Sequence, residues 1–185
     1  MNIFWLDYDI EKAARAMNDV YTYNHIRENG NMILAALMNN GVPDEVLPDV
    51  GVSHQNHPCT EWVGHSLQTM FKTLQFTRAI HNEYRYRYGE EKTHGWYEYV
   101  MNIPTDIYKE YLPDTGELPE PPQTILDAYK CNDFVTAYRY YYVNEKYPKE
   151  WCVYEKGRNE PHWIDDYKLD AGITVPYLER KNIND

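Results

Sequence analysis

The longest regular pattern of apolar side chains in this chain lies between residues 58 and 88. Apolar and aromatic positions recur there at steps of four and three residues, which places them on one face of an α-helix. Pro58 stands where the first turn of a helix tolerates proline. The pattern predicts one long central helix whose core-facing stripe consists of Val63, Leu67, Met70, Leu74, Thr77, His81, Tyr84 and Tyr88.

A second long helix is predicted between the apolar segment 3–6 and Gly41. Asp7 or Asp9 is expected to cap its first turn, and Gly41 is expected to end it. The sequence Asn29-Gly30-Asn31 interrupts helix propensity, but apolar residues resume directly after it. We therefore expect one helix with a kink near Gly30.

The second half of the chain is less regular. A short helix is expected over 96–101, and the proline-rich segment 112–122 is expected to be a surface loop. Residues 132–146 predict a third long helix, capped by Asn132 or Asp133. The fold prediction is thus a single all-α domain over residues 1–185, with about three long helices and several short ones. Its C-terminal tail is expected to wrap onto the core through Trp151, Trp163 and Tyr177.

Composition supports a folded chain but restricts its partners. The hydrophobic share is 43%, and 19 tyrosines supply much of the apolar area. A net charge of -11 argues against general binding to polyanions, although the segment 72–92 holds five basic and three acidic side chains. Three widely spaced cysteines, and the lack of a long apolar run or a signal sequence, predict a cytoplasmic protein with reduced thiols.

Common catalytic and metal-binding motifs are missing from the sequence. There is no Gly-rich phosphate loop, nucleophile elbow or Walker pattern. His54, His57, Cys59 and His65 have residue types that bind metals, but only the His54-x-x-His57 spacing resembles that of ligands. We therefore predict no metal ion and no cofactor.

The end of the predicted central helix, residues 84–88, reads Tyr-Arg-Tyr-Arg-Tyr. Tyrosine and arginine planes stack on exposed bases, so Arg85, Tyr86 and Arg87 are candidates for nucleic-acid contacts. Helical geometry favours the other interpretation, in which Tyr84 and Tyr88 pack inward and the arginines face solvent. His81, on the apolar stripe, is either a buried acid/base group or a hydrogen-bonded core histidine, and the second is the commoner arrangement.

Arg27 and Glu28 lie beside the helix-weakening Asn29-Gly30-Asn31. A carboxylate at that place is a candidate for lining a cleft between the first two long helices. The alternative is an exposed ion pair without function, which is the more frequent situation for charged pairs on helices.

Several segments resemble a phage-encoded family of mostly uncharacterised proteins. They are the start MNIFWLDYDIEKAARAMND, the block NHPCTEWVGHSL, the helix end EYRYRYG, and EPPQTILDAYK followed by AYRYYYVNEKYPKEW. The resemblance covers the chain from Met1 to about Trp163. It is specific to that family but does not name a reaction.

A weaker resemblance links the chain to pyrimidine-dimer DNA glycosylases of the endonuclease V type. These are small all-α proteins with a catalytic glutamate on their first long helix. The resemblance implies that Arg27-Glu28 matches their Arg-Glu pair and that His57-Pro58 matches a turn at the second block. Glu28 would then stabilise the sugar cation and move protons during cleavage of the glycosidic bond.

The chain departs from both families near the candidate site. The related phage proteins commonly have Asp-Lys-His where this chain has Asp19-Val20-Tyr21, and Tyr21 stands seven residues before Glu28 in place of histidine. His25, one turn further along, is a candidate substitute. The glycosylases attack with a small N-terminal residue exposed by removal of methionine. Asn2 is a poor substrate for that removal, so we expect Met1 to stay and the nucleophilic amine to be missing.

Two functions of different classes follow. In the first, the chain is a glycosylase-like enzyme for a damaged or modified base in DNA, with Glu28, Arg27 and His25 as catalytic residues. The residues that would contact the base or the strand are Tyr21, Arg85, Tyr86, Arg87, His57 and His81. In the second, the chain is a non-enzymatic phage accessory protein that binds a nucleotide or a host protein. No membrane association is expected, a virion role is a third alternative, and the oligomeric state stays open.

Overall fold

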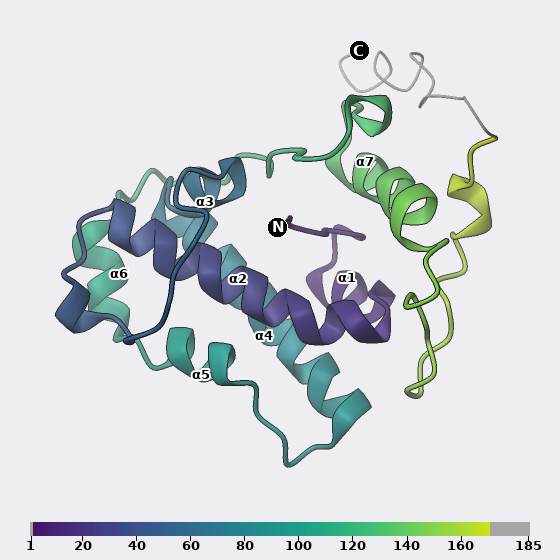
Figure 1. Cartoon of the computed structure of the whole chain (residues 1–185). Helices are drawn as coiled ribbons and strands as arrows, with labels where there is room; N and C mark the ends of the chain where they lie inside the picture. Colours follow the sequence, from purple (N-terminus) through teal and green to yellow (C-terminus); the bar gives the residue numbers. More distant parts are fainter. Residues whose placement is uncertain (1, 171–185) are drawn as a thin grey trace.

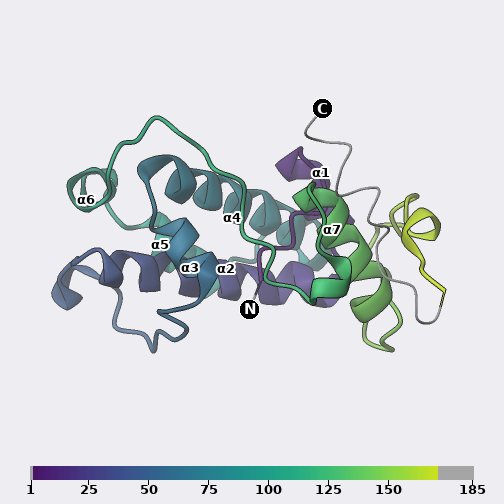
Figure 2. The same cartoon turned by 90° about the horizontal axis from the view of Figure 1, so that it is seen from above.

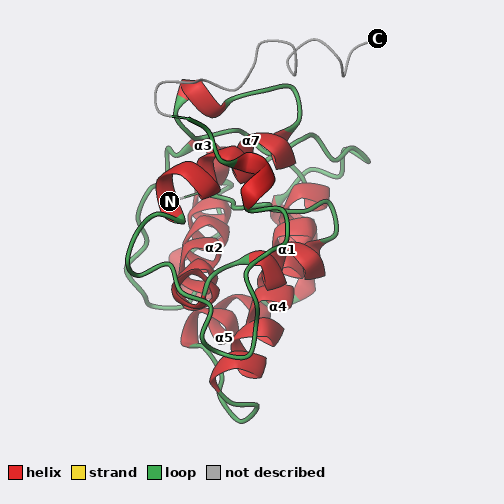
Figure 3. Cartoon of the chain, turned by 90° about the vertical axis from the view of Figure 1, so that its right-hand side faces the viewer, coloured by secondary structure: helices red, strands yellow, loops and turns green. Residues whose placement is uncertain are grey.

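The protein is all-α, as the sequence predicts. The computed structural model describes residues 2–170, and within this range it contains helices and no β-strand (Figure 3). Tyr177, expected to anchor the tail, lies outside the described residues. No helix in residues 2–170 has the length and apolarity needed to cross a membrane. The α-helices are α1 (Ile10–Ala16), α2 (Asp19–Asn39), α3 (Pro58–Val63), α4 (Leu67–Tyr88), α5 (Gly95–Met101), α6 (Thr105–Tyr111) and α7 (Phe134–Tyr141) (Figure 1).

Two long helices, α2 and α4, form the centre of the fold and pack against each other (Figures 1 and 2). Helix α1 packs on α4, and α5 packs on α2. The N-terminal segment 3–6 runs between α2 and α7, where Phe4 contacts Tyr21 of α2 and Tyr141 of α7. Residues 3–6 are therefore buried inside the molecule, next to the first half of α2.

The long helix predicted between segment 3–6 and Gly41 breaks at residues 17–18 and not at Gly30, so the prediction of a kink at Gly30 was wrong. Met17 has an extended backbone, and the side chain of Asn18 accepts a hydrogen bond from the backbone N of Tyr21 to cap α2. Gly30 lies inside a continuous α2. A Cβ at this position would lie 2.9 Å from Cε3 of Trp96, so a larger residue would collide with α5. The glycine permits close packing of α5 and does not bend the helix.

The predicted central helix is also two helices, α3 and α4. Gly64 ends α3, and Ser66 begins α4 with a capping box in which Ser66 and Thr69 exchange hydrogen bonds. The apolar spacing continued across this break, which hid it in the sequence. His57 caps α3 by accepting a hydrogen bond from the backbone N of Cys59.

The third predicted helix, over 132–146, is helical from 134 to 146, but its last part is not α-helical. Asp133 caps α7, which has 8 residues and continues as a π-helical turn over Tyr142–Lys146. Helix α6 was not predicted, whereas α5 and the irregular segment 112–122 agree with the sequence. In the tail, Trp163 is buried on the core, but Trp151 remains 41% exposed.

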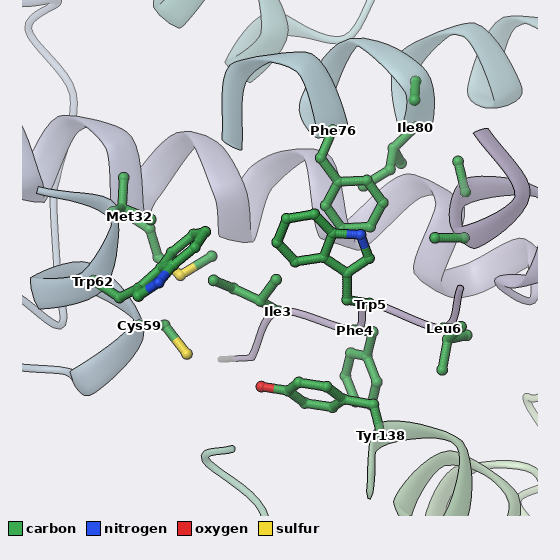
Figure 4. Close-up of a cluster of buried hydrophobic side chains, with 14 of the residues drawn as sticks. Ile3, Phe4, Trp5, Leu6, Met32, Cys59, Trp62, Phe76, Ile80 and Tyr138 are labelled. Carbon is green, nitrogen blue, oxygen red and sulfur yellow. The ribbon is translucent and has the colours of Figure 1, made fainter. Parts of the chain in front are cut away.

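The buried apolar residues form one cluster, with the N-terminal segment at its centre (Figure 4). Trp5 stacks on Phe76 of α4, with ring centroids 5.6 Å apart, and meets Trp62 of α3 edge-on at 6.0 Å. Large buried aromatic rings dominate the energy of such a core. The core therefore fixes the N-terminal segment relative to α2, and this segment shapes the candidate site.

Candidate functional site

Glu28 lies in the third turn of α2, on the side that faces the N-terminal segment. Its Oε2 accepts a hydrogen bond from the backbone N of Asn2 at 3.1 Å. The side chain of Glu28 keeps 23% of its surface exposed. The carboxylate is thus held in place by the protein and remains accessible to a ligand.

Asn2 is itself held by its side chain. Its Oδ1 accepts hydrogen bonds from the hydroxyl of Tyr138 at 2.8 Å and from Oγ1 of Thr124 at 2.9 Å. Its Nδ2 donates to the carbonyl of Thr124 at 3.0 Å. Burial raises the pKa of Tyr138, so its hydroxyl keeps its proton and acts as a donor. These contacts fix the nitrogen of Asn2 against Glu28.

His25 is fully buried beside the same carboxylate. Its Nε2 accepts a hydrogen bond from the backbone N of Phe4 at 3.2 Å, and its Nδ1 lies 3.8 Å from Oε2 of Glu28. Burial lowers the pKa of His25, although the charge of Glu28 opposes that shift. The neutral ring therefore carries its proton on Nδ1, the nitrogen nearest Glu28.

A pocket of about 340 Å³ opens beside Glu28. Trp96 of α5 is the one large apolar side chain of its lining, and Arg27 of α2 supplies a positive charge. Its volume is within the range of pockets that hold small molecules, although its lining is more polar than is usual for them. The lining residues are Arg27, Glu28, Asn31, Gly51, Ser53, His54 and Trp96.

The loop between α2 and α3 closes one side of the pocket. Asn31 Oδ1 accepts a hydrogen bond from the backbone N of Ser53 at 3.1 Å, which ties the loop to α2. His54 has φ of 61°, a left-handed conformation that is uncommon outside glycine. The backbone N of His57 and Oγ1 of Thr60 both donate to the carbonyl of His54 and hold this turn.

Two further predicted site residues, Tyr21 and His57, do not line the Glu28 pocket, although the charge of Glu28 affects both. Burial raises the pKa of Tyr21, and the charge of Glu28 adds to that shift. Burial lowers the pKa of His57, and the charge of Glu28 opposes the shift. Of the predicted site residues, the structure therefore brings Arg27 and His25 next to Glu28.

The basic end of α4, residues 85–87, does not line the Glu28 pocket. Arg87 is buried, and its guanidinium donates to Glu83 at 2.7 Å and to Asp19 at 3.0 Å. Arg85 Nε donates to the carbonyl of Glu90, and the ring of Tyr86 lies 3.9 Å under the guanidinium of Arg158. These side chains support the end of the helix and are absent from the Glu28 pocket.

His81 is a packed core residue. Its ring stacks on Tyr97, with centroids 3.7 Å apart, and its Nε2 accepts a hydrogen bond from the backbone N of His94. Burial, with a smaller effect of Arg85, lowers the pKa of His81 to about 4. This arrangement matches the structural interpretation of His81.

No three histidine, cysteine, aspartate or glutamate side chains among residues 2–170 converge as metal ligands do. His54 and His57 approach each other edge to face, with ring centroids 6.3 Å apart. Cys59 is buried, and its Sγ lies 3.2 Å from Oγ1 of Thr124. The two histidines of this loop therefore contact each other, and Cys59 of α3 contacts the segment that precedes α7.

Sequence reasoning missed Asn2 and Trp96 as parts of the site. Both reach Glu28 or its pocket through contacts between distant segments, and neither stands in a motif. Their only signals were the apolar segment after Asn2, which had to be buried, and Gly30, which marked a close approach to α2.

The fold and the site together define an all-α protein with an accessible carboxylate that is hydrogen-bonded to its own N-terminal segment beside a small polar pocket. Comparison with protein-family models, with curated proteins and with solved structures found no match to this chain.

Proposed function

We propose that this chain binds a nucleobase in the Glu28 pocket and that Glu28 promotes cleavage of the N-glycosidic bond of a damaged or modified nucleotide in DNA. The observation that supports this most directly is the hydrogen bond between Glu28 and the backbone N of Asn2 at the pocket. It holds a carboxylate at a fixed place while leaving one side of it open.

Cleavage of this bond builds positive charge on the sugar as the base departs. A fixed, partly buried carboxylate favours such a transition state because it does not have to reorganise during the reaction. Glu28 can also accept a proton from the water that attacks C1′, while the departing base takes up a proton. The bond between C1′ and the base nitrogen breaks, and a new bond joins C1′ to the water oxygen.

The pocket offers suitable contacts for a base taken out of the stack. Trp96 supplies an aromatic ring for stacking, and Asn31 and Ser53 supply hydrogen-bonding groups at the rim. Arg27, on the exposed side of α2, is placed to contact a phosphate or to orient the base. In this proposal Arg27 binds the phosphate or the base, and Glu28 acts on the sugar.

The nitrogen of Asn2 determines which variant of the chemistry is available. It is an amide nitrogen while Met1 precedes it, and a primary amine only after removal of Met1. An amine beside Glu28 would displace the base at C1′, and the departing base would take up a proton. The C1′–O4′ bond would then break, with a proton going to O4′, and leave a Schiff base between C1′ and the amine. With Met1 present, water is the nucleophile and no covalent adduct forms.

The proposal is tested with duplexes that contain ultraviolet lesions, abasic sites or hydroxymethyluracil. Released base and nicked strand are measured for the unaltered chain, Glu28→Gln and Glu110→Gln, the last altering an exposed glutamate of α6. We expect release by the unaltered chain and by Glu110→Gln, and a loss of at least about 100-fold in Glu28→Gln. Borohydride trapping and the mass of the intact chain report whether an amine at residue 2 takes part.

Binding without reaction is the second candidate, supported by the net charge of -11 and by the engagement of Arg87 in buried contacts. In that case the pocket holds a nucleotide, or the acidic surface binds a host protein of an infected cell. Thermal stabilisation by nucleotides in the absence of base release would favour this alternative, since a ligand stabilises the folded state according to its concentration over Kd. If the chain releases no base and is not stabilised by any nucleotide, both nucleotide proposals are contradicted.

A further inference from the structure

A line of half-buried side chains runs along the solvent side of α2. Its members stand three or four residues apart, so they share one face of the helix. At 1.5 Å per residue, Tyr21 lies about 10 Å along the helix axis from Glu28. From the start of the helix towards its end, the line consists of Tyr21, Asn24, Glu28 and Asn31.

An exposed tryptophan extends this line at the Tyr21 end. The rings of Trp151 and Tyr21 meet edge to face, with centroids 5.5 Å apart. The backbone N of Asp19 donates to the carbonyl of Val153 at 2.9 Å, which ties the segment after α7 to the start of α2. In Figure 1 this segment lies beside the right-hand end of α2. Trp151 still keeps 41% of its surface exposed, so a ring face remains accessible.

The charge around this aromatic pair differs from that of the whole chain. Residues 130–158 contain six basic and four acidic side chains, whereas the complete chain has a net charge of -11. The ammonium group of Lys146 lies 5.0 Å over the ring of Tyr141, and that ring stacks on Phe4, which in turn packs on Tyr21. Arg139 and Arg158 of this segment are paired with Asp7 and Glu83. The lysines of the segment, Lys146 among them, are therefore the side chains that would meet the phosphates of a strand reaching Trp151.

We infer that Trp151 and Tyr21 form a stacking platform for a second base of the same strand whose target base enters the Glu28 pocket. The inference rests on the proposed function. Neighbouring stacked nucleotides are 3.4 Å apart along a strand, and the platform and Glu28 are about 10 Å apart. That distance corresponds to about three stacked nucleotides, so a ligand that reaches both places contains several nucleotides. The ligand is accordingly an oligonucleotide rather than a free nucleotide.

The test compares one nucleotide with a short strand. Binding of thymidine monophosphate, of hexathymidylate and of hexauridylate is measured by calorimetry, the last two distinguishing DNA from RNA. The variants are Trp151→Leu, which keeps an apolar side chain without a ring, and Trp151→Phe, which keeps a ring. Circular dichroism and the unfolding midpoint control for folding.

We expect Trp151→Leu to weaken binding of a hexanucleotide about tenfold and to leave the mononucleotide unchanged, because stacking on an aromatic side chain contributes at this level per base. Trp151→Phe should restore most of the affinity. Equal hexanucleotide affinity in Trp151→Leu and the unaltered chain, with normal mononucleotide binding, would overturn the platform alone. If no nucleotide and no strand binds the unaltered chain, the proposed function and this inference are both wrong.

Discussion

Asn2 determines how the N-terminal segment meets Glu28. Its side-chain oxygen accepts hydrogen bonds from Thr124 and from Tyr138, which is fully buried. Its backbone N, in turn, donates to Glu28. A carboxylate held this way keeps its position when a ligand approaches, which is the property that electrostatic catalysis requires. At the scale of single residues, the candidate site thus depends on side chains that no ligand touches.

Tyr138→Phe tests this dependence. The change removes the hydroxyl that lies 2.8 Å from Asn2 Oδ1 and 2.7 Å from the carbonyl of Pro122. We expect the free energy of unfolding to fall by about 1–2 kcal/mol, because buried acceptors lose their donor. The amide of Phe4, which donates to His25, should exchange its hydrogen faster. Urea denaturation and hydrogen exchange measure the two effects.

The matched control is Tyr99→Phe, which removes a hydroxyl from an exposed ring on α5. It should leave both the unfolding free energy and the exchange of Phe4 unchanged. Equal behaviour of the two variants would mean that Asn2 is held without help from Tyr138.

At the scale of elements, apolar spacing located the helices but not their breaks. The stripe from Val63 to Tyr88 follows α3 and α4 with little interruption, because Gly64 and Ser66 turn the chain without changing the buried face. The break at Asn18 was missed because its cap is a local hydrogen bond in a sequence that also suits a helix. Glu28 was predicted as a site residue from its neighbours in sequence and from the resemblance to glycosylases. Asn2 was not, because its contact with Glu28 spans 26 residues.

Gly30 makes the packing of α2 and α5 testable. Alanine favours a helix over glycine by about 1 kcal/mol, yet a Cβ at residue 30 would lie 2.9 Å from Trp96 Cε3 and 3.2 Å from Trp96 Cβ. We expect Gly30→Ala to destabilise the protein by about 1–3 kcal/mol, because an overpacked contact forces α5 to shift. In the background of Trp96→Ala, the penalty should become smaller, since the ring is gone.

The comparison is a double-mutant cycle measured by thermal and urea unfolding. Gly51→Ala, at a position with open space around it, is the control and should change stability little. Additive effects of Gly30→Ala and Trp96→Ala would show that the ring does not set the distance between these helices.

At the scale of the whole molecule, a buried network of charges connects three parts of the chain. Arg87 of α4 donates to Asp19 at the start of α2 and to Glu83 one turn earlier on α4. Arg158 of the tail donates to both oxygens of Glu83, at 2.7 and 2.9 Å. The network explains how Arg87 is accommodated in the interior, because two carboxylates balance its charge. It also fixes the tail that carries Trp151 against the start of α2, where the platform is proposed.

Glu83 gives this network a dependence on pH. Desolvation alone would raise the pKa of Glu83, but the hydrogen bonds and charges of Arg158 and Arg87 outweigh it and lower the pKa. A carboxyl whose pKa is lower in the folded state stabilises the fold above its unfolded pKa of about 4.3, and this contribution is lost as the pH falls through the lower folded value. Glu83→Gln should therefore reduce the free energy of unfolding by about 3 kcal/mol at neutral pH and by clearly less near pH 3. Urea denaturation across this range measures the difference, with the exposed Glu110→Gln as control. A loss that stays the same at both ends of the range would mean that the charge of Glu83 does not stabilise the junction of α2, α4 and the tail.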